Sequence, residues 1–109
     1  MYRVGMIVVL MLSMSVCGFA ESKLTPVADG IYAYVGASDP GPATAYGSNV
    51  GVIVGDNAIL VVDTLMSARG GQQIVDDIRA VSDKPIKWVV NTHHHGDHTL
   101  GNCVFAKLG

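Results

Sequence analysis

The amino-acid sequence predicts a fold of the mixed α/β (α+β) class, on two observations. Short β-branched runs and longer segments with helical spacing succeed one another along its 109 residues, in the order strand, strand, strand, helix, strand, helix. The strands are almost continuously hydrophobic, which is typical of a sheet buried on both faces. Only one helix-covered layer is encoded, so we expect the chain to be the amino-terminal half of a larger layered domain.

Three strands are predicted in the first half of the chain. Residues 30–35 alternate aliphatic and other side chains, and residues 50–54 and 58–62 are β-branched runs. These two runs are separated by Gly55-Asp56-Asn57, a sequence typical of a hairpin turn. Residues 36–47 are rich in Gly, Pro, Ala and Ser, so we expect a loop there.

Two helices and one further strand are predicted in the second half. Apolar residues recur at helical spacing in two places, first as Ile74, Val75, Ile78 and Val81, and then as Leu100, Val104, Phe105 and Leu108. Pro85 stops the first helix. The apolar run at residues 86–90 then predicts a strand, and the second amphipathic helix is expected to end at Gly109.

The first twenty residues are predicted to be a signal peptide, which leaves residues 21–109 as the mature part. Arg3 supplies a positive charge, an apolar core follows at residues 4–16, and Gly18-Phe19-Ala20 offers small residues for cleavage. The core is shorter than the roughly 20 residues that a helix needs to span a bilayer. We therefore expect cleavage after residue 20, export to the periplasm or secretion, and no stable membrane anchor afterwards.

The two cysteines carry separate expectations. Cys17 is an alternative site of lipid attachment, which would make the protein a lipoprotein, but the bulky Val16 before it disfavours that processing. Cys103 is the single cysteine of residues 21–109, so no internal disulfide is expected there. We expect Cys103 to be a buried apolar side chain on a helix.

Charge excludes one class of partner. Removing the predicted signal peptide takes away Arg3 alone among the charged residues, which leaves 6 Lys and Arg against 9 Asp and Glu and a formal charge of −3. A nucleic-acid surface needs a basic excess, so no nucleic-acid partner is expected. A small-molecule substrate is expected instead.

All four histidines lie in one stretch, His93-His94-His95-Gly96-Asp97-His98. Three imidazoles and a carboxylate at the spacing His-x-His-x-Asp-His are the ligands that zinc and similar cations prefer. The stretch directly follows the strand at residues 86–90, so it should lie at the carboxyl edge of the sheet, where ligand sites gather. Residues two apart in extended backbone point the same way, so His93 and His95 would bind one ion while His94 faces elsewhere.

With Thr92 before it, this stretch resembles the metallo-β-lactamase-fold hydrolase superfamily. Two earlier segments, Val61-Val62-Asp63-Thr64 and Ser48-Asn49-Val50-Gly51, contribute to the resemblance, which covers about residues 24–109. The resemblance implies an αββα sandwich, of which this chain would be the amino-terminal half.

The resemblance also implies roles for individual residues. His93 and His95 would bind a first metal, and Asp97 and His98 a second, with two Zn²⁺ ions in a complete domain. Asp97 would in addition act in catalysis by orienting the nucleophilic water or relaying its proton. Asp63 would brace the metal-binding loop by hydrogen bonds, as the orientation of ligating histidines requires.

The implied function is an exported metal-dependent hydrolase, in which metal-bound hydroxide attacks the carbonyl of an ester, thioester or amide such as a β-lactam. An iron-dependent oxidoreductase similar to persulfide dioxygenases, or a non-catalytic fragment, stays open as an alternative on the same fold. One departure from the family is plain: no His follows His98, and no Asp or Glu follows Asp97. We therefore expect a truncated chain that is poorly folded and inactive alone.

Overall fold

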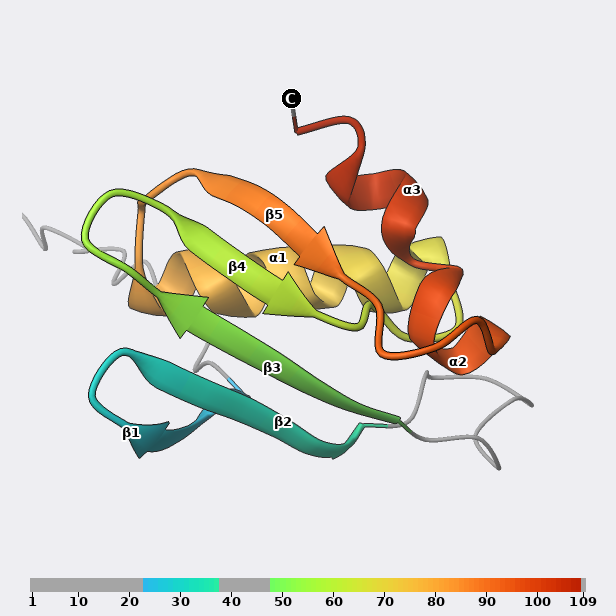
Figure 1. Ribbon diagram of the computed structural model, residues 1–109, viewed down its shortest axis with the longest axis horizontal. Coiled ribbons are helices and arrows are strands. Elements are labelled where there is room, and N and C mark those ends of the chain that lie inside the picture. Colours follow the sequence, from blue (N-terminus) through green and yellow to red (C-terminus); the bar gives the residue numbers. More distant parts are fainter. Residues whose placement is uncertain (1–22, 38–47, 109) are drawn as a thin grey trace, which may run out of the picture.

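One mixed sheet organises residues 23–37 and 48–108, the part of the chain that the computed structural model describes (Figure 1). The strands lie in chain order: β1 (Thr25–Ala28), β2 (Ile31–Ala37), β3 (Ser48–Val54), β4 (Ile59–Val62) and β5 (Ile86–Val90). Neighbours are antiparallel from β1 to β4, and β5 runs parallel to β4. The predicted α/β class is confirmed. The predicted signal peptide and most of the predicted 36–47 loop lie outside the described residues.

Helix α1 (Ala68–Val81) makes the crossover from β4 to the parallel strand β5 and covers one face of the sheet (Figure 1). It begins where the Ser67 hydroxyl accepts a hydrogen bond from the Gly70 N–H at 3.0 Å, a standard N-cap. Its apolar stripe packs on the inward side chains of β3 and β4; the core consists of Leu24, Val50, Val52, Ile59, Val61, Leu65, Ile74, Val75, Ile78 and Phe105. Among the described residues, none of the helices has the length and apolar character needed to cross a membrane.

The other face of the sheet is also apolar, but it is open to solvent. Cross-strand pairing sets Ile31, Ile53, Leu60 and Trp88 in one row across β2 to β5. Ile31, Ile53 and Trp88 are 41%, 44% and 56% exposed. The expectation of strands buried on both faces is therefore wrong for residues 23–37 and 48–108, because the described helices cover one face alone.

The strand predictions succeed where the apolar run is long and regular. Strand β5 has the predicted bounds, and β4 ends where Asp63 adopts a positive φ of 64°. Strand β2 begins one residue later than expected and continues to Ala37, so the predicted loop begins later than Gly36. Strand β1 was not predicted, because its exposed residues include Pro26 and show no apolar alternation.

The second predicted helix is wrong as a single element. The chain instead forms two short helices, α2 (Gly96–Thr99) and α3 (Asn102–Phe105), with Gly101 between them. Gly101 lies so close to β4's end that a Cβ there would fall 1.9 Å from the Thr64 carbonyl oxygen. The Gly101 N–H donates to the Leu65 carbonyl at 3.2 Å and so does not continue the hydrogen bonds of α2. Leu100 is 56% exposed, and Cys103 is exposed rather than buried as expected.

Candidate metal centre

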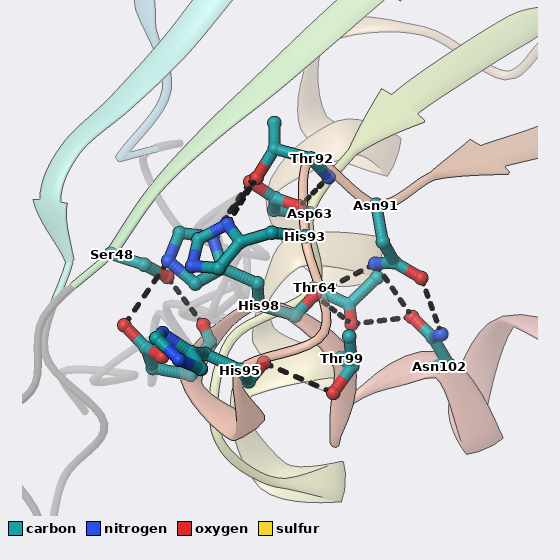
Figure 2. Close-up of polar contacts among 11 residues, drawn as sticks. Ser48, Asp63, Thr64, Asn91, Thr92, His93, His95, His98, Thr99 and Asn102 are labelled. Atoms are coloured by element: carbon teal, nitrogen blue, oxygen red, sulfur yellow. Dashed lines mark hydrogen bonds and ion pairs between the residues drawn. The ribbon is translucent and has the colours of Figure 1, made fainter.

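The histidines lie where the parallel strands β4 and β5 end side by side. The segment after β4 and the segment after β5 are tied together by the Asp63 N–H, which donates to the Val90 carbonyl at 2.9 Å, and by the Thr64 N–H, which donates to the His98 carbonyl at 3.0 Å. Figure 2 shows the side chains that gather around this junction. The sequence-based placement of the histidines directly after β5 agrees with this geometry.

Asp63 is the most heavily bonded side chain of the site. It is 3% exposed, and its carboxylate accepts hydrogen bonds from the Thr92 N–H, the Thr92 hydroxyl and His98 Nδ1, each at 2.8 Å (Figure 2). Burial alone raises the pKa of Asp63, but the hydrogen bonds that its carboxylate accepts from Thr92 and His98 outweigh this effect, so that the pKa lies below its ordinary value. Asp63 is therefore ionised at neutral pH.

The hydrogen bonds around Asp63 also determine which ring nitrogens carry protons. The single proton of the Thr92 hydroxyl goes to Asp63, so the hydroxyl oxygen must accept from His93 Nδ1, which lies 3.0 Å away. His98 Nδ1 likewise donates to the carboxylate. A neutral ring that donates through Nδ1 leaves Nε2 unprotonated, and this tautomer is the form of histidine that binds a metal ion.

Asp97 and His98 already lie at the separation of two neighbouring ligands. His98 Nε2 is 3.2 Å from Asp97 Oδ2, and both side chains are partly buried. Two ligands held at about 2.0–2.1 Å from one ion at tetrahedral or octahedral angles lie roughly 2.9–3.4 Å apart. The pair is therefore suited to hold a cation.

The other three imidazoles, those of His93, His94 and His95, are exposed. The His93 ring centroid is 4.0 Å from that of His98 and 4.8 Å from that of His95. His94 is also 4.9 Å from His95, so proximity does not separate His94 from the predicted ligands. Within the described ranges, no three His, Cys, Asp or Glu side chains are arranged to hold a metal ion as they stand. The ligand assignment of His93, His95, Asp97 and His98 stays a prediction.

Sequence reasoning assigned no role to four polar residues that hold the ligand segment from behind. The Ser48 hydroxyl donates to the Asp97 carbonyl at 2.5 Å, and Asn91, Thr64 and Asn102 form a hydrogen-bonded group beneath the His98 carbonyl (Figure 2). A signal existed for two of them, because Thr64 and Asn91 directly follow strands that end at the edge where the histidines lie. The segment that begins at Ser48 contributed to the family resemblance without suggesting a task for the Ser48 side chain, and nothing local marks Asn102.

Comparison with known proteins agrees with this geometry. The family model described as the metallo-beta-lactamase superfamily matches residues 43–109, which contain every residue of the site. A linear primary-alkylsulfatase from Pseudomonas sp. (strain ATCC 19151) is 38% identical over 55 residues, or 50% of this chain. The aligned region is 10% of that relative's length, so the chain spans a small part of the protein that it resembles.

Proposed function

This chain belongs to the metallo-beta-lactamase superfamily. From that premise we propose that it is part of a metal-dependent hydrolase that cleaves ester bonds. The observation that carries the proposal is the pair of contacts that the two ring nitrogens of His98 make. Its Nδ1 is bonded to the buried Asp63 carboxylate at 2.8 Å, while its Nε2 faces Asp97 Oδ2 at 3.2 Å. A carboxylate behind the ring and a second donor in front of it form the arrangement that orients a ligating histidine.

The donor set fits the metals that members of this superfamily usually bind. We assign His93, His95, Asp97 and His98 as ligands, the first two to one ion and the last two to a second. Imidazole nitrogens with one carboxylate oxygen suit Zn²⁺ better than they suit Mg²⁺ or Ca²⁺. When bound, zinc would lower the pKa of a coordinated water and polarise the substrate.

The residues of the chain have separable tasks in this proposal. Asp63 stays ionised and, with the Thr92 hydroxyl, keeps His93 and His98 in the tautomer that binds metal. Asp97 is half-buried and has its carboxylate turned to His98, so we assign it the task of holding a proton during turnover. We give His94 no ligand role, because residues two apart in extended backbone face the same way and His94 lies between His93 and His95.

The similarity to an alkylsulfatase selects the first substrate class to test, which is a sulfate ester with a linear primary alkyl chain. Carboxylic esters, thioesters and β-lactams form the second class, because a polarised carbonyl would suit the same donors. The assay uses the protein expressed from its complete gene and loaded with zinc, and it measures sulfate released from hexyl sulfate beside hydrolysis of the carbonyl substrates.

A matched control is His95→Ala, which should abolish whichever activity is found. Zinc-dependent release of sulfate, or of a carboxylate from the second class, supports the hydrolase. A wild-type protein that is isolated with iron and no zinc, and that hydrolyses neither class, would contradict it and favour the iron-dependent oxidoreductase.

Export is part of the same proposal. The supporting feature is the pattern of residues 1–20, a basic residue, an apolar core and a small-residue cleavage site. Amino-terminal sequencing of secreted or periplasmic material should begin at Glu21. A lipid-modified start at Cys17 would show a lipoprotein instead.

A further inference from the structure

The backbone carbonyl of His98 lies over a polar group that no ligand role explains. It accepts hydrogen bonds from the Thr64 N–H at 3.0 Å and from the Asn91 side-chain amide at 2.8 Å. Thr64 is fully buried. The backbone of a predicted ligand is thus held by two strand ends at once.

Asn102 connects the members of this group. Its Nδ2 donates to Asn91 Oδ1 at 2.7 Å, and its Oδ1 accepts from Asn91 Nδ2 at 3.2 Å and from the Thr64 hydroxyl at 2.7 Å (Figure 2). Because Asn91 Oδ1 is engaged by Asn102, the Asn91 amide nitrogen is the atom that turns toward the His98 carbonyl. Asn102 therefore determines the orientation of the side chain that holds His98.

A simple structural task does not account for Asn102. It is the first residue of α3, yet the start of α3 has no side-chain capping hydrogen bond, and the side chain points at β5's end instead. Asn91 and Asn102 also line a pocket of about 330 Å³ between β5 and α3, so water can reach this side of the group. If the Asn102 amide were removed, water would occupy its place. The change would then alter the orientation of Asn91 more than it would lower the free energy of unfolding.

We propose that Asn102 is a positioning residue for the metal centre, acting through Asn91 and the His98 backbone. The inference rests on the proposed function, because it assumes that His98 binds a metal. With its carbonyl held from below and its Nδ1 held by Asp63, the His98 ring keeps one orientation, and its Nε2 meets Asp97 at a fixed separation. The described hydrogen bonds of the Asn102 side chain are with Asn91 and Thr64 and not with the predicted ligand side chains.

The experiment compares Asn102→Ala with Val104→Ala in the protein from the complete gene. Val104 lies on the same short helix and packs against the core without joining the polar group, so it controls for loosening of α3. Zn²⁺ affinity is measured by competition with a chromophoric chelator. The visible absorption spectrum of the Co²⁺-loaded protein reports ligand geometry, and thermal unfolding of the metal-free protein reports stability.

Asn102→Ala should bind Zn²⁺ about 10–100-fold more weakly, as is usual when an outer hydrogen-bond partner of a ligand is removed. Its saturated Co²⁺ spectrum should also shift. Val104→Ala should lower the unfolding temperature but keep both the affinity and the spectrum of the wild type. Asn102→Asp should behave like Asn102→Ala, because a carboxylate oxygen would face Asn91 Oδ1 and turn that amide away.

Two results would overturn the inference alone: wild-type affinity and spectrum in Asn102→Ala, or the same loss in Val104→Ala as in Asn102→Ala. Failure of the proposed function looks different. A wild-type protein that binds no metal, or one whose metal content is unchanged by His95→Ala, would overturn that function and this inference with it.

Discussion

The two halves of the candidate centre differ in how they are held. Behind the ligands, Asp63 and Thr64 are 3% and 0% exposed, and every polar contact described for them is with a residue distant in sequence. In front, His93, His94 and His95 are exposed, and their described contacts are with one another except that His93 also contacts His98 and the Thr92 hydroxyl. The comparison indicates that the chain builds a buried polar support for His98 and His93 and leaves His94 and His95 without a bond to that support among the described contacts.

The exposed half should control metal content most strongly. In the protein from its complete gene, His95→Ala should lose bound metal, with an affinity loss greater than the roughly 10–100-fold typical of an outer partner, because a direct ligand is removed. His94→Ala should keep its metal, since residues two apart face the same way and His94 lies between them. Metal-to-protein ratios of both variants decide this, and equal loss would mean that the alternation is wrong.

The buried half should control stability most strongly, at Gly101. A Cβ at this position would lie 1.9 Å from the Thr64 carbonyl oxygen and 2.9 Å from its carbon, so backbone must move. We expect Gly101→Ala to lower the free energy of unfolding by about 3 kcal/mol. Denaturant unfolding compares this loss with that of the control variant Gly55→Ala. Gly55 lies at an exposed turn, where a Cβ would be 3.2 Å from its nearest neighbour, the Ala58 carbonyl oxygen. Similar losses in both variants would show that Gly101 carries no special constraint.

Asp63 joins the two halves, so its substitution should affect both readouts. Asp63→Asn keeps a residue that tolerates the positive φ of 64°, but its amide would face donors from Thr92 and His98. We expect a loss of about 1–3 kcal/mol in unfolding free energy, because buried donors lose their acceptor.

The matched control for Asp63 is Asp76→Asn on the exposed side of α1, where the carboxylate accepts one exposed hydrogen bond from Gln72. That change should stay within about 0.5 kcal/mol. Weaker metal binding should accompany Asp63→Asn alone. Unaltered metal affinity in this variant would separate Asp63 from the centre.

Ser48 should give the smallest effect, about 1 kcal/mol in unfolding free energy for Ser48→Ala. Its buried hydroxyl donates to the Asp97 carbonyl across 49 positions of sequence, so the bond links β3 to α2. Thr99→Ala removes a local, exposed bond to the His95 carbonyl and should cost less. Thermal unfolding compares the two, and a larger loss in Thr99→Ala would contradict the idea that distant bonds hold the ligand segment.

Local pattern sufficed for much of the fold. The run Ile86–Val90 predicted β5 with its observed bounds, and the spacing of Ile74, Val75 and Ile78 predicted the buried side of α1. Both predictions depend on residues within one element. Burial that depends on another element was harder to predict: Leu100 and Cys103 were expected inside, yet both are exposed where the expected single helix is divided into α2 and α3.

By itself, the sequence determined the inventory of the centre: three imidazoles and a carboxylate at fixed spacing, delivered at the end of a strand. Tertiary structure decided which of these donors are braced. Asp63 and His98 are 35 positions apart, and they meet because β4 and β5 pair in parallel with Val62 beside Val90. That register depends on burying the side chains of β4 and α1 against each other. Because this packing involves several elements at once, it cannot be predicted from the sequence of any one of them.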